Sequence, residues 1–144
     1  MCNLIYLIIM ENMNLFELNN LTEKEARKEN PQKLAFVGDA VYSLYVRNKI
    51  VLNNNCKTNE LHKLTSEIVK AGGQSGFVEN ILNVLTEQEL EVYKRARNYK
   101  TSNVAKNAKV TDYKRATGLE ALIGYLYLYG NLERINQIFK MMKD

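Results

Sequence analysis

Residues that break or bend a backbone are scarce in this chain. Its 144 residues include only seven glycines and a single proline, Pro31. A β-sandwich needs many tight turns, which glycine and proline usually supply, so this composition argues against that class of fold. It favours helices joined by short loops, in a chain long enough for one domain with a core and too short for two.

Ligands for zinc and iron–sulfur clusters are scarce as well. The chain has two cysteines, Cys2 and Cys56, and one histidine, His62. The cysteines form no Cys-x-x-Cys pair, and one imidazole cannot complete such a centre, so zinc and iron–sulfur sites are excluded. We interpret His62, which follows Leu61 in an expected helix, as a structural residue.

Long hydrophobic runs are absent too. Residues 1–10 (MCNLIYLIIM) are apolar but fall far short of the roughly 20 residues that span a bilayer. They have no basic flank before them and no small-residue cleavage site after them, which argues against a signal peptide. We therefore expect a cytoplasmic protein without membrane association, in which residues 1–13 are a leader or disordered extension.

Apolar residues recur with helical spacing along the first part of the chain. The segment Thr22–Glu25 has the form of a capping box and predicts a short helix that ends before Pro31. The next helix is expected over residues 32–51, about five turns by pitch. Its apolar face is made of Leu34, Val37, Val41 and Leu44.

Five more helices are expected beyond residue 55. One is capped by Thr58 or Asn59 and stopped by the glycines at 72–73, one covers residues 77–85, one is opened by the capping box Thr86–Glu89, one covers 114–129 with Thr111 or Asp112 as its cap, and one covers 132–142. Residues 98–110 are expected to form a polar, basic loop. No segment alternates with period two, so the sequence predicts an all-α fold with a single domain over residues 14–144.

Positive charge is concentrated in one segment. The net charge of the chain is only +4, but the window from Lys94 to Arg115 holds eight lysines and arginines against one acid, Asp112. That window therefore carries +7, which leaves −3 for the rest of the chain. Such a segment suits a phosphate-binding surface. The alternative is a solvated lysine-rich loop, and charge alone does not decide between the two.

Two acids lie in apolar runs, whereas most acids of the chain lie on polar faces. Asp39 (AFVGDAVY) and Glu120 (GLEALIG) are each the only charge of such a run. A carboxylate in a half-apolar site is costly unless it is paired or binds a metal. Gly38 and Gly124, beside these acids, lack a Cβ atom and would let two helix backbones approach closely.

The pair of acids suits Mg²⁺ chemistry. Mg²⁺ prefers oxygen ligands and usually takes one or two carboxylates from a protein while it keeps several waters. In phosphodiester hydrolysis the ion lowers the pKa of a bound water and neutralises charge on the transition-state oxygens. Asp39 and Glu120 are therefore our candidate catalytic residues and Mg²⁺ ligands. The alternative, on the pattern alone, is that each acid is merely the polar edge of a core helix.

The runs around the two acids resemble the signatures of a known nuclease family. LAFVGDAVY and GLEALIGYLYL are similar to the two acidic motifs of the ribonuclease III family, and most closely of its short bacterial form, Mini-ribonuclease III, which consists of the nuclease domain alone. The similarity runs from about Leu15 to the C-terminus and includes the segments VKAGGQ, RARN and VAKN. Several separated motifs in the same order make this resemblance specific.

The resemblance implies an all-α homodimer whose two active sites flank a groove for double-stranded RNA. It also implies Mg²⁺-dependent cleavage in the maturation of ribosomal RNA precursors, chiefly the 23S RNA of the large subunit. By motif match, Asp39 takes the place of the family's essential aspartate and Glu120 that of its metal-binding glutamate. Full-length members carry two further acids where this chain has Ala35 and Thr117, a loss that the short form shares.

The sequence has no counterpart of the separate RNA-binding domain of full-length members. We therefore expect the basic segment to hold the phosphates itself, because A-form RNA is read through its backbone and 2′-hydroxyls. The residues proposed for RNA binding are Arg97, Asn98, Lys100, Lys106 and Asn107.

Two other functions remain open. The first is a ribosome-associated domain that binds structured RNA without cutting it, which the missing acids at Ala35 and Thr117 support and the retained Asp39 and Glu120 oppose. The second is a helical DNA-binding or protein-interaction module. It would explain the charge but not the two carboxylates in apolar runs.

Overall fold

Helices make up every regular element in the part of the chain that the structure describes. This computed structural model describes residues 21–100 and 109–141, without the side chains of residues 71–73. The all-α prediction is confirmed over these ranges. The leader expected at residues 1–13 lies outside the described residues and stays a prediction. None of the described helices is long and apolar enough to cross a membrane.

The first described helix begins at the residue that its capping signal indicates, and the second begins one residue before its expected start at residue 32. In α2, Glu23–Lys28, the Thr22 hydroxyl accepts a bond from the Glu25 amide (3.2 Å) and the Glu25 carboxylate accepts one from the Thr22 amide (2.8 Å). In α3, Pro31–Asn53, the proline occupies the first helical position, where no amide proton is needed. The helix ends two residues later than expected.

The glycines at 72–73 do not stop the helix before them, contrary to expectation. Helix α4, Thr58–Val69, ends earlier because Lys70 adopts an extended backbone, and α5, Ala71–Ile81, starts directly after it. The glycine pair therefore lies in the first turn of α5. The expected cap was wrong as well, since Lys57 holds the cap position and Thr58 is already helical.

The second half of the chain follows the expected order with one shifted boundary. A short 3-10 helix, η1 (Leu82–Val84), leads to α6, Glu87–Arg97, which the expected capping box at Thr86 opens. Helix α7, Val110–Leu128, begins four residues before the expected start, because Lys109 is extended and its carbonyl accepts from the Tyr113 amide (3.0 Å). Thr111 and Asp112 therefore lie inside its first turn rather than at its cap.

Gly130 separates α7 from the last helix. Its φ of 84° is left-handed, a conformation that glycine adopts without strain. The amides of Gly130 and Asn131 donate back to the carbonyls of Tyr127 (3.0 Å) and Leu126 (2.8 Å), which closes α7 in a Schellman motif. Asn131 then caps α8, Leu132–Lys140.

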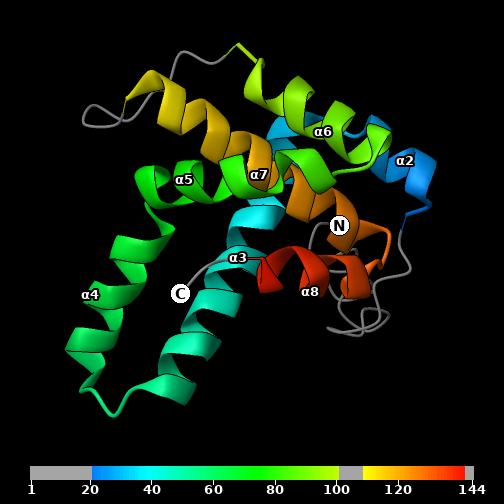
Figure 1. Cartoon of the computed structure of the whole chain (residues 1–144). Coiled ribbons are helices and arrows are strands. Elements are labelled where there is room, and N and C mark those ends of the chain that lie inside the picture. The colour runs from blue at the N-terminus through cyan, green and yellow to red at the C-terminus, as the bar shows by residue number, and fades with distance from the viewer. Residues whose placement is uncertain (1–20, 101–108, 142–144) are drawn as a thin grey trace, which may run out of the picture.

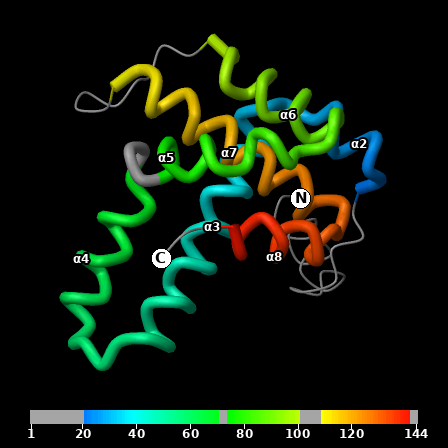
Figure 2. The backbone as a smooth tube through the Cα atoms, in the orientation of Figure 1, coloured from blue at the N-terminus to red at the C-terminus, as the bar shows by residue number. Residues whose placement is uncertain are grey.

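Helix α7 runs through the middle of the molecule (Figure 1), and α3, α5 and α6 all pack on it. Its stretch from Leu119 to Leu126 is buried apart from Glu120, which is half-buried. The C-terminal half of α3 and all of α4 project away from this centre as a two-helix arm (Figure 2). The core of the molecule and both acidic motifs therefore meet where α3 crosses α7.

Two glycines allow α3 and α7 to cross with their backbones in contact, as expected. A Cβ atom on Gly38 would overlap the backbone carbonyl of Glu120. A Cβ atom on Gly124 would likewise overlap the carbonyl of Leu34. The contact therefore joins the residue before Asp39 to the backbone of Glu120 itself.

The expected apolar face of α3 is only partly in the core. Leu34 is fully buried, but Val37 and Val41 are half-buried and Leu44 is 56% exposed. The crossing with α7 uses a neighbouring face instead, because that face carries the small residues that permit close approach. The residues of α3 that are buried are Pro31, Leu34, Ala35, Gly38, Tyr42, Val46 and Ile50.

Candidate active site

Three helices enclose a pocket of about 390 Å³ at the crossing of α3 and α7. Side chains that line it recur at helical spacing on each of the two crossing helices, so one face of each helix is presented to the pocket. The end of α6 closes the third side. The lining residues are Gln32, Ala35, Phe36 and Asp39 from α3, Tyr113, Lys114, Thr117 and Glu120 from α7, and Ala96, Arg97 and Tyr99 at the end of α6.

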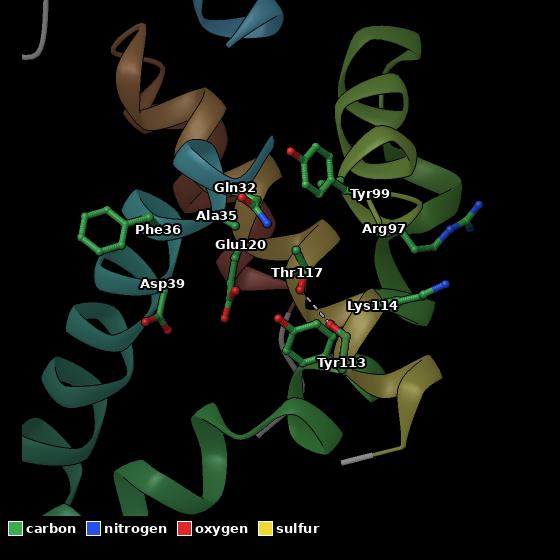
Figure 3. Close-up of a pocket in the computed structure, with 11 residues that line it drawn as sticks. Gln32, Ala35, Phe36, Asp39, Arg97, Tyr99, Tyr113, Lys114, Thr117 and Glu120 are labelled. Carbon is green, nitrogen blue, oxygen red and sulfur yellow. Dashed lines mark hydrogen bonds between the residues drawn. The ribbon is translucent and has the colours of Figure 1, made fainter. Parts of the chain in front are cut away.

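Asp39 and Glu120 meet in this pocket, although they lie far apart in the sequence. Figure 3 shows both carboxylates pointing into the same opening between α3 and α7. Asp39 is exposed, while Glu120 is half-buried. Ala35 and Thr117 also line the pocket, so the space next to the two acids is bordered by a methyl group and a hydroxyl.

Gln74 from α5 contacts the inner of the two acids. Its side-chain amide donates a hydrogen bond of 3.1 Å to Oε1 of Glu120. Burial raises the pKa of Glu120 to about 7, the bond from Gln74 opposes this rise, and the nearby Asp39 carboxylate adds to it. The pocket thus holds a carboxylate whose charge is costly until a cation is bound next to it.

The raised pKa predicts how Glu120→Gln changes stability in metal-free protein. Well below pH 4.5, the ordinary pKa of a glutamate, both states bind the proton and the two variants differ little. As pH rises from there to about 7, the unfolded chain releases its proton while the folded chain keeps it, so the folded protein loses stability. The glutamine variant should therefore be more stable above pH 7, by about 3 kcal/mol at most.

Urea titrations in EDTA at several pH values measure this gain. Glu91→Gln, on the exposed face of α6, removes a carboxylate that does not line the pocket and serves as the control. A difference between Glu120→Gln and wild type that stays constant from pH 5 to pH 8 would contradict the prediction.

The cations expected to bind RNA are unequally placed. Arg97 lines the pocket, with its guanidinium 5.6 Å from the centre of the Tyr93 ring and its Nε bonded to the Asn98 side chain (3.1 Å). Lys100 is exposed and does not line the pocket. Lys106 and Asn107 lie outside the described residues.

Two arginines of the basic segment serve the fold instead. The guanidinium of Arg95 donates to the backbone carbonyls of Arg27 (2.6 Å) and Glu29 (2.8 Å), which ties α6 to the end of α2. Arg115 pairs with Glu79 of α5 at 2.7 Å. The segment is therefore not one uniform phosphate-binding surface.

Lys114 and Gln74 were not among the site residues expected from the sequence. Lys114 belongs to the basic segment but lines the pocket beside Thr117, three positions along α7. The helical spacing of Tyr113, Thr117 and Glu120 could have indicated this face, had the start of α7 been located correctly. Gln74 is the last residue of the VKAGGQ segment that shares the family resemblance, but its contact with Glu120 depends on how α5 packs on α7.

The carboxylate oxygens of the pocket are ligands that suit a hard cation, one that takes few ligands from the protein. Among the described residues no group of three or more histidines, cysteines, aspartates or glutamates gathers closely enough to hold a metal ion. Two carboxylates with open space beside them match the one or two that Mg²⁺ usually takes.

Comparison with known proteins gives the family. The model of the ribonuclease III domain matches residues 32–131, which include both acids. Mini-ribonuclease 3 of Clostridium tetani is 44% identical over 122 residues, covering 84% of this chain and 81% of its own. Mini-ribonuclease 3 of Brevibacillus brevis is 48% identical over 109 residues, or 76% of this chain and 81% of its own.

A solved structure agrees with these relatives. The crystal structure of a protein from Fusobacterium nucleatum, 36% identical, superposes with a TM-score of 0.71 and covers 80% of this chain and 92% of that one. Sequence motifs, helical fold and relatives all give the same assignment. The chain therefore belongs to the ribonuclease III family of endoribonucleases.

Proposed function

We propose that this chain is a Mg²⁺-dependent endonuclease that cleaves double-stranded RNA in the cytoplasm. The observation that carries the proposal is that Asp39 and Glu120 line one pocket whose wall also holds Arg97 and Lys114. Two acidic side chains can hold a cation, and two positively charged side chains beside them can hold the phosphates on either side of a reacting phosphodiester. The name of the relatives, Mini-ribonuclease 3, supports RNA as the substrate.

In this proposal Asp39 and Glu120 hold Mg²⁺. When bound, the ion supplies a water of lowered pKa and neutralises charge that develops on the phosphate oxygens. Glu120 projects from a helix whose backbone is fixed against Gly38, so the backbone that carries its carboxylate is in place before RNA arrives. Arg97 and Lys114 bind the RNA backbone and orient it over the two acids.

The direct test is an assay of purified protein on long double-stranded RNA, analysed on a denaturing gel. We expect cleavage with Mg²⁺ and none with EDTA, and no cleavage of a DNA duplex of the same sequence. RNA that is bound but never cut, with Mg²⁺ or with Mn²⁺, would contradict the proposal. It would favour the alternative of a non-catalytic domain that binds structured RNA.

The salt dependence of RNA binding tests the role of Arg97 and Lys114. Each phosphate contact releases condensed counterion, so the slope of log affinity against log salt is roughly −0.7 to −0.9 per contact. Replacing both residues by glutamine should flatten that slope by about one to two units and weaken binding to all RNA duplexes alike. Binding is measured with Ca²⁺ in place of Mg²⁺, at several salt concentrations.

The matched control replaces two cations that do not line the pocket, Lys24 and Lys140. Both double variants remove the same charge, so a general effect of net charge would appear equally in each. If the slope changed no more for Arg97 and Lys114 than for the control, the phosphate-binding surface would have to lie elsewhere.

We further propose that two copies of the chain assemble through the exposed apolar face of α3. Phe36 is 82% exposed and Leu44 is 56% exposed, and a contiguous exposed apolar patch often marks a protein–protein interface. With Val37, Ala40, Val41 and Tyr127 they border a shallow hollow of about 420 Å³. Phe36 and Asp39 line both this hollow and the pocket, so a partner copy here would lie next to the active site.

Charge placed on this face should separate the copies. Wild-type protein should show about twice the chain mass of 16.6 kDa in light scattering, and a variant with Phe36→Glu and Leu44→Glu should show the single mass. Leu132→Glu on α8, another exposed apolar position, is the control and should leave the dimer intact. A wild-type chain that is monomeric at assay concentrations and still cuts both strands would refute this assembly.

The natural substrate follows from the family resemblance rather than from the pocket. We propose precursors of ribosomal RNA, chiefly the 23S RNA of the large subunit. This substrate would be supported if precursor RNA accumulated in cells that lack the protein and disappeared when active protein was restored.

A further inference from the structure

Gln74 is a buried polar side chain that joins three helices at the active site. It is 1% exposed and lies in the first turn of α5, directly after the break at Lys70. Its side-chain amide nitrogen donates to the carbonyl of Val69 at the end of α4 (2.8 Å). The same nitrogen donates to Oε1 of Glu120 on α7 (3.1 Å).

The chemistry of its two partners determines how the Gln74 amide is oriented. The Val69 carbonyl and the Glu120 carboxylate are both acceptors, so the NH₂ group and not the oxygen must face them. The two protons of that group are thereby used. The amide oxygen is buried, and no donor from the described residues reaches it.

Folding stability alone gives a weak reason for an amide at this position. Burial of an amide oxygen that no protein group satisfies costs about 1–3 kcal/mol, which an apolar side chain of similar length would avoid. The bond to Val69 caps one carbonyl of α4, a contribution of about 1 kcal/mol. The bond to Glu120 is the contact that bears on the reaction.

We propose that Gln74 is a positioning residue that holds the Glu120 carboxylate in the orientation needed to bind the cation. The proposal rests on the function proposed above and goes beyond it by adding a residue from a third helix. By holding Oε1 of Glu120 from the α5 side, Gln74 leaves the other oxygen to the pocket that Asp39 also lines. Groups that orient metal-binding carboxylates in this way typically change metal affinity or activity by about 10–100-fold when they are removed.

The geometry also connects the two-helix arm to the active site. The end of α4, the start of α5 and Glu120 of α7 meet in the one amide group of Gln74. In Figure 1, α5 leaves the upper end of α4 and runs across α7. A change in the direction of α4 would therefore move the group that holds Glu120.

The test compares Gln74→Met with wild type in three measurements. Methionine keeps the length of the side chain and removes the NH₂ group. Binding of Mn²⁺, followed by calorimetry without RNA, should weaken by about 10–100-fold. Turnover at subsaturating Mg²⁺ should fall while the KM for RNA stays unchanged. The melting temperature in EDTA should stay within a few degrees of wild type.

Two controls separate a positioning role from a structural one. Thr65→Val removes a buried hydroxyl of α4 that donates to the carbonyl of Leu61 in the same helix (2.8 Å), and it should leave Mn²⁺ binding unchanged. In a Glu120→Gln background, Gln74→Met should cause little further loss of Mn²⁺ affinity, because both changes act on one carboxylate.

The outcomes are distinguishable. The positioning role would be overturned if Gln74→Met left the Mn²⁺ affinity unchanged. It would also be overturned if the loss of affinity added in full to that of Glu120→Gln, or if Thr65→Val caused an equal loss. If wild-type protein binds Mn²⁺ but never cuts RNA, the proposed function fails, whereas the effect of Gln74 on metal binding is still measured and decided.

Discussion

Asp39→Asn is expected to abolish cleavage of double-stranded RNA, with turnover lower by at least about 10³-fold, equivalent to about 4 kcal/mol. Asparagine keeps the size of the side chain and removes the charge that would hold the cation. Because Asp39 is exposed, its replacement should leave the melting temperature within a few degrees of wild type. Single-turnover cleavage at saturating RNA measures the chemical step.

Binding measured with Ca²⁺ separates this variant from the phosphate-binding ones. Asp39→Asn should keep the salt slope of RNA binding and lose the reaction. The Arg97 and Lys114 double variant should instead have a flatter slope and keep most of the turnover at saturating RNA. Asp112→Asn is the control, because it removes an acid from the first turn of α7 that does not line the pocket. Near-normal turnover of Asp39→Asn would show that the active site is elsewhere.

Gly124→Ala is expected to destabilise the fold by about 3 kcal/mol or more, a large part of the stability of a small domain. The added Cβ atom would overlap the carbonyl of Leu34, and a backbone group cannot rotate away as a side chain can. The helices α3 and α7 would have to separate, and Asp39 and Glu120 with them. Gly38→Ala should act in the same way, since its Cβ atom would overlap the carbonyl of Glu120.

Gly76→Ala is the matched control for both changes. Gly76 lies in α5, and a Cβ atom there meets nothing within 4 Å. Alanine in that helix should raise stability by up to about 1 kcal/mol, because it lowers the entropy of the unfolded chain. Urea titrations followed by circular dichroism compare the three variants. A loss at Gly124 as small as the change at Gly76 would mean that the two helices are not in backbone contact.

Helix ends were predictable where the signal is a side chain close in sequence. Thr22 and Thr86 open their helices with capping boxes because each bond spans only three residues. The break between α4 and α5 was placed wrongly, since Lys70 is extended without any glycine or proline signal of its own. The break coincides with the packing of α5 on α7, and a local sequence pattern cannot predict that long-range contact.

The apolar pattern of α3 correctly predicted a helix, but it did not indicate which of its apolar residues the core would cover. Periodicity shows that Leu34 and Leu44 belong to apolar faces of a helix, but not what covers them. Leu34 packs in the core, whereas Leu44 is exposed and is proposed here to face a second copy. The same helical spacing of apolar residues is expected whether they pack in the core of one chain or against a second copy.

The sequence by itself determined that the chain is helical, which family it resembles and which two acids stand out. Each of these is a local property: a charge within an apolar run, or a motif of a few residues. Only the tertiary structure decided that Gln74 bonds Glu120, that Lys114 lines the pocket, and that Arg95 and Arg115 are engaged within the fold. Those contacts join residues on different helices. Their geometry depends on how closely α3, α5 and α6 pack on the buried helix α7, and two glycines allow the close approach of α3.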